Sequence, residues 1–470
     1  MYRSEYILIF ILAALLGLQG CSKYDEDFAR YADSVTVSTS DNALRAKISV
    51  HYNKSCAYQI KYWEKESGEV SAKYTKTANA APGDNVQTLK FLAQSTDYQF
   101  QIVVNGKATS KIVDFRTKRL PPDIPVYNVE MSDGATRLDG AMLQWDAASP
   151  GYVTLSDFDG KIIWYQAYGE GIRTGFFDAK SGHLALLTGF KYGEDNNKFK
   201  RVANNIIISD LNGNILFKRK PYPGFIDNPH HEFSIMPDGN LLILGNIIKD
   251  YNLSSIDPKL SEVPIWGDGF FVTDPAGKII KQWDCFKGIN PLEADYVDPV
   301  KFSQDYLHAN SVTSDSEGNY YMTFNRISEL WKIDGNSGDV IYRLGANGNI
   351  DLKGGDYPKG GLHAATVLAP DRILCYDNGS NRGYSRAVVF NIDAASMTAK
   401  YDLVVNLPKE FSSNNRSNAQ IIGDNIILMS STVSAKAVFA TLEGDIIRVL
   451  SRSGISYRAY WIDADIMNNL

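Results

Sequence analysis

Four of the six histidines in this 470-residue chain fall in three short segments, each at a matching place in a repeated β-strand pattern. These histidines are His230 and His231, His308, and His363, and an apolar strand-like run follows each segment. Residues at the same point of repeated units face one axis when the units are arranged around it. Imidazole can act as a nucleophile, a proton shuttle or a metal ligand, so the three segments predict one polar site.

Two further polar residues accompany the histidines. Asn310 follows His308 closely, and Arg326 comes just after the strand-like run Tyr320–Thr323. Arginine is a permanent planar donor suited to tetrahedral oxyanions, and an amide or imidazole adds further donors. A neutral imidazole could attack sulfur or phosphorus while a second one moves the proton. A single histidine is more often structural, but three in register favour a site that handles an anion.

The elements that position these residues are repeats. From about 125 to 470 the chain repeats one phrase six times: an apolar strand, a turn containing Asp or Gly, and a second apolar strand. The copies turn at Gly160, Gly213, Gly277, Gly338, Asp393 and Gly444. Such units predict four-stranded blades, and six blades around an axis form a β-propeller whose inner loops converge on a central channel.

A smaller domain precedes the repeats. Residues 34–118 alternate in short strand-like runs, which is the rhythm of a β-sandwich. The phrase Leu92–Ile102 looks like the tyrosine-bearing corner of a fibronectin type III-like domain, and the proline-rich residues 119–124 predict a stiff linker. The predicted fold is therefore all-β: a six-bladed β-propeller at 125–470, preceded by a small fibronectin type III-like β-sandwich.

The start of the chain reads as an export signal. Tyr6–Leu18 is nearly uninterrupted apolar sequence, too short to span a bilayer comfortably. The ending Leu18-Gln19-Gly20-Cys21 resembles a bacterial lipobox. It predicts a lipoprotein signal peptide at 1–20, lipidation of Cys21 and a linker at 21–33. We expect a protein of the bacterial cell envelope, lipid-anchored to the outer membrane on its periplasmic or outer face. An ordinary cleaved signal peptide would change the anchoring but not the compartment.

Composition excludes some partners. The formal charge of −6 and the pI near 5.6 give no basic field, which argues against nucleic acid. Cys56, Cys285 and Cys375 are far apart and show no C-x-x-C spacing, so neither a zinc ribbon nor a disulfide framework is predicted. No cofactor is indicated, and the sandwich offers an element through which two chains could form a homodimer.

Several phrases together resemble the bacterial arylsulfate sulfotransferase family. They are His230–Phe233 with Pro237–Leu242, His308–Val312, Asn325-Arg326 with Trp331–Asp334, and Leu362–Ala364 with Tyr376–Gly379. The resemblance covers nearly the whole mature chain and implies a small β-sandwich followed by a six-bladed propeller. It also implies ping-pong transfer of a sulfuryl group from a phenolic sulfate to a phenol, independent of nucleotide sulfate donors.

Motif matching to that family implies roles for individual residues. His363 would be the nucleophile that is transiently sulfurylated, and His308 the acid/base. The sulfuryl oxygens would be held by His231, Asn310 and Arg326. Whether His230 or His231 faces the site is open; His231 is favoured because an acidic residue follows it directly.

Departures from the family pattern concern substrate and folding route more than the reaction. Leu362 stands where the family often has Gln, and Tyr306 stands where it has Trp. The nearby cysteine pair of some members is absent, so no disulfide should be needed for maturation.

Two other functions stay open from the sequence. One is a non-catalytic surface propeller that binds sulfated or phenolic ligands or glycans. The other is a metal site in which the imidazoles hold zinc. The metal site is less favoured because Arg326 would repel a cation.

Overall fold

A computed structural model describes residues 27–39, 42–189, 203–221, 225–226 and 228–468. The predicted signal peptide and Cys21 lie outside these residues, as does the first part of the predicted linker. The chain divides into two compact units, Met1–Leu120 and Pro121–Leu470. The described residues contain no helix long and apolar enough to cross a membrane.

The first unit holds two antiparallel sheets among its described residues. One has the order β1 (Ala32–Ser38), β2 (Ala46–Tyr52), β6 (Gly83–Leu89). The other has the order β4 (Lys73–Tyr74), β3 (Cys56–Glu64), β7 (Asp97–Val104), β8 (Ala108–Thr109), with β5 (Ala78–Ala80) on β3 and β9 (Val113–Arg116) on β7. Alternate residues of β7 are buried, as a strand with one face on a core requires.

Tyr98 forms the corner contact expected in this unit. Its Oη accepts a hydrogen bond from the Ala93 main-chain N–H at 2.8 Å. Its ring stacks on Phe115 with centroids 5.3 Å apart. A tyrosine hydroxyl that bonds to the main chain a few residues upstream is the feature of a tyrosine corner. The fibronectin type III class of this unit stays a prediction.

The second unit is built from six sheets among its described residues. Their four-stranded cores, in chain order and from the first strand of each, are β35 (Tyr460–Asp463), β11 (Gly140–Trp145), β12 (Tyr152–Ser156), β13 (Ile162–Ala167); β14 (Ile172–Asp178), β15 (His183–Thr188), β16 (Asn205–Asp210), β17 (Ile215–Arg219); β18 (Pro229–Ile235), β19 (Leu241–Tyr251), β20 (Val263–Thr273), β21 (Ile279–Asp284); β22 (Ala309–Ser314), β23 (Tyr320–Phe324), β24 (Glu329–Ile333), β25 (Val340–Leu344); β27 (Leu362–Ala369), β28 (Arg372–Asp377), β29 (Arg386–Asp393), β30 (Thr398–Asn406); and β31 (Ala419–Ile422), β32 (Ile426–Ser431), β33 (Lys436–Thr441), β34 (Ile446–Arg452). Two more strands lie at outer edges, β10 (Tyr127–Ser132) on β34 and β26 (Asp351–Lys353) on β30.

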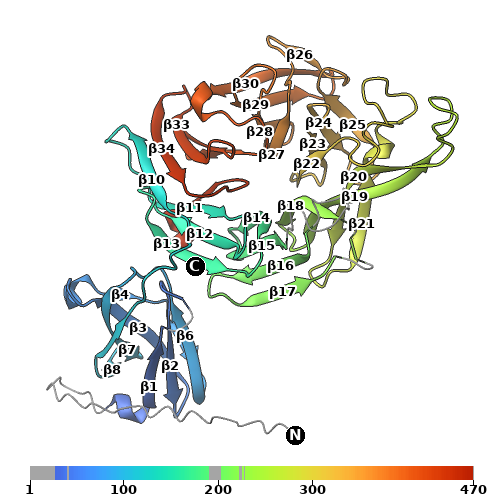
Figure 1. Cartoon of the computed structure of the whole chain (residues 1–470). Coiled ribbons are helices and arrows are strands. Elements are labelled where there is room, and N and C mark those ends of the chain that lie inside the picture. Colours follow the sequence, from blue (N-terminus) through green and yellow to red (C-terminus); the bar gives the residue numbers. More distant parts are fainter. Residues whose placement is uncertain (1–26, 40–41, 190–202, 222–224, 227, 469–470) are drawn as a thin grey trace, which may run out of the picture. The chain divides into compact units, whose positions relative to one another are not determined.

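These sheets follow one another around a central axis (Figure 1). Both ends of the unit help to close the ring: the late strand β35 pairs with β11, and the early strand β10 pairs with β34. Closure of this kind leaves only short, protected sheet edges. The all-β, propeller-like prediction is confirmed, and the number of sheets among the described residues is the number that a six-bladed ring requires.

Local sequence explains the hairpins. At the turn between β12 and β13, Asp157 Oδ1 accepts from the Lys161 N–H at 2.8 Å, and the Gly160 N–H donates to the Asp157 carbonyl at 3.0 Å. Gly160 has φ +81°, a conformation that glycine adopts without steric cost. Asp210 and Asp274 accept from the main chain in the same way at two later hairpins. The repeated Asp and Gly residues therefore specify repeated turns.

Aromatic and aliphatic side chains fill the space between neighbouring sheets. Between the sheets that contain β20 and β23, the rings of Phe270 and Trp283 stack with centroids 5.6 Å apart, beside the buried Met322. Burying a side chain the size of Phe270 or Met322 contributes roughly 1.5–3 kcal/mol. Such packing fixes each sheet against the next and so fixes the strands nearest the axis.

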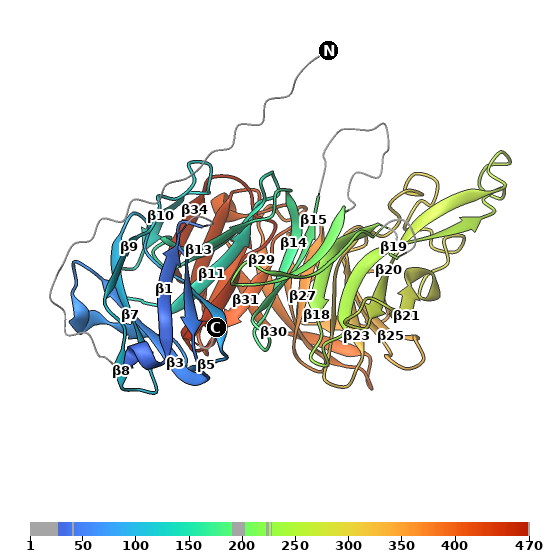
Figure 2. The ribbon, with the colours of Figure 1, turned by 90° about the horizontal axis from the view of Figure 1, so that it is seen from below.

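β19 and β20 are longer than their counterparts and form a projecting hairpin (Figure 2). The extended part of β20 holds the segment that precedes β22. The Trp266 N–H donates to the Ser303 carbonyl at 2.6 Å, and the Tyr306 N–H donates to the Trp266 carbonyl at 3.0 Å. The hairpin therefore fixes the main chain on both sides of Asp305.

Candidate active site

The strands nearest the axis begin irregularly. Register shifts occur between Ile172 and Thr174 in β14, and between Ala309 and Ser311 in β22. Comparable shifts occur near the starts of β18 and β27. A β-bulge bends its strand and redirects a side chain, and bulges are common beside active sites.

Two of the predicted histidines also have unusual backbone conformations. His231 has φ +57° and His308 has φ +58°. Residues other than glycine rarely adopt a positive φ, and such positions cluster at functional sites. The irregular starts of the strands therefore turn these side chains away from the regular pleat.

A cavity of about 300 Å³ lies where these strands begin. It is lined by Arg173, His231, His308, Asn325, His363, Asn415, Arg416 and Tyr457. Each of the six axial strands contributes one of these at or just before its start: Arg173 for β14, His231 for β18, His308 for β22, His363 for β27, Arg416 for β31 and Tyr457 for β35. The cavity therefore collects three imidazoles and two guanidinium groups.

His231 is bonded on both ring nitrogens. Arg173 Nη2 lies 2.9 Å from His231 Nε2, and because arginine has no acceptor, Nε2 must accept. In a neutral ring Nδ1 then carries the proton and donates to His230 Nδ1 at 2.8 Å. His230 is left with its proton on Nε2, which lies 3.4 Å from Asp268 Oδ1. His231 thus lines the cavity, while His230 lies behind it.

His308 is held by a carboxylate. Its Nδ1 lies 2.8 Å from Asp305 Oδ2, and its ring centroid is 5.4 Å from that of His231. Arg326 Nη2 donates to the same Asp305 oxygen at 3.0 Å. A carboxylate on one imidazole nitrogen fixes the ring and stabilises its protonated form, which suits a group that carries a proton.

His363 is held by an amide instead. Asn378 Oδ1 lies 2.5 Å from its Nδ1, and the Arg416 main-chain N–H donates to its Nε2 at 3.2 Å. Burial lowers the pKa of His363 from 6.5 to about 3, and His308 acts in the same direction, while the Asn378 hydrogen bond opposes them. The ring is therefore neutral near pH 7, the form in which imidazole is a nucleophile.

Two residues predicted for the site do not belong to the lining of this cavity. Asn310 is fully buried; its Nδ2 donates to the Leu362 carbonyl at 2.7 Å and its Oδ1 accepts from Thr323 Oγ1 at 2.7 Å. The Arg326 guanidinium bonds to Asp305 and to the Tyr306 carbonyl and lies 3.8 Å from the Phe302 ring centroid. Both side chains thus hold the elements that carry the histidines.

Arg173, Arg416 and Tyr457 were missed by the sequence analysis. The search followed histidines, which occupy this place in only some repeats. The available signal was the place itself: the first residues of the axial strands in the remaining repeats carry Arg173, Arg416 and Tyr457. A search by repeat position rather than by residue type would have found them.

Ligands for a metal ion and for a disulfide bond are placed apart. The described residues contain no group of three or more His, Cys, Asp or Glu side chains placed to hold a metal ion. Cys56, Cys285 and Cys375 are buried free thiols.

Comparison with known proteins decides the family. Residues 126–461 match the family described as Arylsulfotransferase (ASST). The chain belongs to the arylsulfotransferase family. It is therefore an enzyme that transfers a sulfuryl group, and the family implies a phenolic sulfate as donor and a phenol as acceptor.

Similarity to individual proteins is low. No curated protein matches the sequence of this arylsulfotransferase. Among solved structures, a protein of unknown function from Bacteroides caccae is 12% identical, with a TM-score of 0.44, covering 69% of this chain and 99% of that one. A catalytically inactive virginiamycin B lyase from Staphylococcus aureus is 12% identical, with a TM-score of 0.37, covering 70% and 100%. The WD40 β-propeller domain of Doa1 is 12% identical, with a TM-score of 0.32, covering 70% and 97%.

Proposed function

We propose that this enzyme transfers the sulfuryl group in two steps through a sulfohistidine at His363, without a nucleotide sulfate donor. The observation that carries the proposal is a neutral, buried imidazole whose Nε2 lies in a cavity with two guanidinium groups. A ping-pong route splits one difficult displacement into two easier ones.

In the first step the His363 Nε2 lone pair attacks the sulfur of the aryl sulfate. The bond between sulfur and the phenolic oxygen breaks, and His308 donates its proton to the departing phenolate. In the second step the acceptor phenol returns a proton to His308 while its oxygen attacks sulfur. The N–S bond breaks and neutral His363 is regenerated.

Charge on the sulfuryl oxygens needs donors. Arg173 and Arg416 are the guanidinium groups of the cavity lining, and we assign the sulfuryl oxygens to them. On donor binding the Arg173 side chain can exchange its contact with His231 Nε2 for a sulfuryl oxygen. Arg326 acts through Asp305 on His308, and Asn310 acts through the main chain of Leu362.

Kinetics with two substrates test the two-step route. Initial rates measured across a grid of nitrophenyl sulfate and phenol concentrations should give parallel double-reciprocal lines. Without acceptor, a burst of about one nitrophenol per enzyme should precede slow turnover. Intersecting lines and no burst would mean direct transfer between two bound substrates.

We also propose that Cys21 carries lipid and holds the enzyme at the outer membrane, as the lipobox-like Leu18–Cys21 predicts. Detergent-phase partitioning of the full chain should depend on this residue. A Cys21→Ser chain that partitions like the parent would remove this part of the proposal.

A further inference from the structure

Asn378 touches the proposed nucleophile but has no role in the steps above. We propose that Asn378 is a positioning residue that fixes the tautomer and direction of His363, so that Nε2 carries the lone pair. This inference rests on the sulfohistidine route. The amide, the imidazole and the loop that holds them each support it.

The orientation of the Asn378 amide is set by two carbonyl groups. Its Nδ2 donates to the Ser413 carbonyl at 2.7 Å and to the Arg416 carbonyl at 3.1 Å. Rotating the amide by a half turn would bring Oδ1 against both carbonyl oxygens, and both hydrogen bonds would be lost. Asn378 is 1% exposed, so water does not replace them. Oδ1 must therefore face His363.

An amide oxygen can only accept. Since Oδ1 lies 2.5 Å from His363 Nδ1, the ring proton must sit on Nδ1. A neutral imidazole has one N–H group, so Nε2 holds the lone pair. The Arg416 N–H, which is directed at Nε2 from 3.2 Å, agrees with that assignment because a donor needs an acceptor there.

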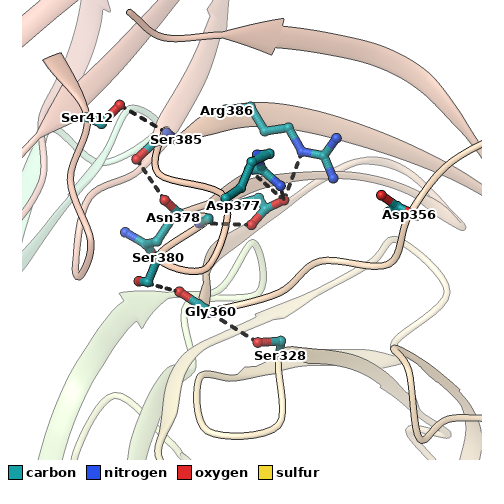
Figure 3. Close-up of polar contacts among 12 residues, drawn as sticks. Ser328, Asp356, Gly360, Asp377, Asn378, Ser380, Ser385, Arg386 and Ser412 are labelled. Atoms are coloured by element: carbon teal, nitrogen blue, oxygen red, sulfur yellow. Dashed lines mark hydrogen bonds and ion pairs between the residues drawn. The ribbon is translucent and has the colours of Figure 1, made fainter. Parts of the chain in front are cut away.

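The main chain around Asn378 is fixed as well. Figure 3 shows Asp377 bonded to Arg386, and Asn378 bonded through its carbonyl to Ser385. Arg386 Nε donates to Asp377 Oδ2 at 2.8 Å, and Ser385 Oγ donates to the Asn378 carbonyl at 3.0 Å. Ser380 Oγ bonds to the Gly360 carbonyl at 2.7 Å, which ties the loop to the segment leading into His363. The amide is thus held by side chain and backbone together.

An amide suits this histidine better than a carboxylate would. Asp305 stabilises the protonated form of His308, which must carry a proton. The same partner at His363 would favour an imidazolium, and an imidazolium has no lone pair on Nε2 to attack sulfur. The amide directs the ring without adding charge. The two histidines therefore have partners that match their separate roles.

The test replaces the amide and follows the donor half-reaction against pH. Asn378→Asp should give burst rates that fall about tenfold per pH unit on the acid side, below an apparent pKa near 7. The parent enzyme should be flat over that range. Asn378→Ala should lower the burst rate roughly 10- to 100-fold while the donor KM stays within about threefold. Asn381→Asp, an exposed residue with the same change of charge, should behave like the parent.

A measurement on the parent protein removes dependence on the folding of these variants. Nitrogen-15 NMR of histidine-labelled enzyme, with signals assigned by their loss in His363→Gln, should show Nδ1 protonated and Nε2 bare. A proton on Nε2, or Asn378 variants with the parent's pH profile and rate, would overturn the inference. Failure of the sulfohistidine route would look different: the parent would form no covalent adduct, whatever its tautomer.

Discussion

Asp305 Oδ2 lies 2.8 Å from His308 Nδ1, which gives the proposed acid/base of this arylsulfotransferase an anionic partner. The carboxylate is itself fixed by Arg326, and β20 holds the main chain on both sides of it. The arrangement resembles the base-orienting carboxylate of hydrolytic triads in its logic. This contact and the others of the site lead to specific expectations for individual side chains.

Asp305→Asn should lower kcat by about 100-fold or more, because the amide no longer stabilises protonated His308. The loss should be smaller for a nitrophenyl sulfate than for phenyl sulfate, since a nitrophenolate leaves without much help from an acid. Rates across a series of leaving phenols measure this. A loss of equal size for every donor would show that Asp305 serves only folding.

The three arginines should separate kinetically. Arg173→Met or Arg416→Met should raise the donor KM by roughly tenfold or more, because each removes a charge-assisted hydrogen bond to the sulfate. Arg326→Met should lower kcat instead, since it loosens Asp305. Arg372→Met, which removes an exposed ion pair with Asp402, is the matched control and should change neither constant. If Arg326→Met raised KM most, the sulfuryl oxygens would belong to Arg326.

The neutral state of His363 predicts how stability depends on pH. Its pKa is lowered from 6.5 to about 3 by burial, so the unfolded chain binds the proton more strongly than the folded one. Stability is therefore present above about pH 6.5 and is lost as the pH falls toward 3, by at most about 1.4 kcal/mol per pH unit from this group. Urea unfolding at several pH values should show a flatter acid slope for His363→Gln. Identical slopes would mean that His363 is not buried in its neutral form.

The buried ion pair between Glu232 and Arg458 should matter for stability. Arg458 Nη1 donates to Glu232 Oε2 at 2.7 Å, and Arg458 is 2% exposed. Burial raises the pKa of Glu232, and Arg458 offsets that effect. Arg458→Ala should cost about 3–5 kcal/mol of unfolding free energy because it strands a buried carboxyl. The double variant Arg458→Met with Glu232→Gln should recover much of that loss; no recovery would point to packing rather than charge.

Much of this fold could be predicted from the sequence because its determinants are local. Alternating apolar residues and Asp–Gly turns specify hairpins wherever they occur, and repetition specifies the ring. The meeting of His231, His308 and His363 followed from their shared place in the repeat. Repeat position gives the end of a strand at which a residue lies, but not the direction of a long side chain. That is why Arg326 was expected at the sulfuryl oxygens, although its guanidinium bonds to Asp305.

Other features depend on contacts across the ring. Arg173 and Arg416 come from separate sheets, and only closure brings their side chains to one cavity. The partners of the histidines are also distant in sequence from one another: Asp305 precedes β22, whereas Asn378 follows β28. No local pattern marks Asn378 as the residue that bonds to His363.

Intact-mass spectrometry after exposure to an aryl sulfate, without acceptor, tests the covalent step most directly. The parent enzyme should gain the mass of one SO3 group, peptide mapping should place it on His363, and added phenol should remove it. His363→Ala should gain nothing, while His231→Ala should still form the adduct slowly. A parent enzyme that turns over aryl sulfate yet never gains this mass, or gains it at a residue other than His363, would contradict the account.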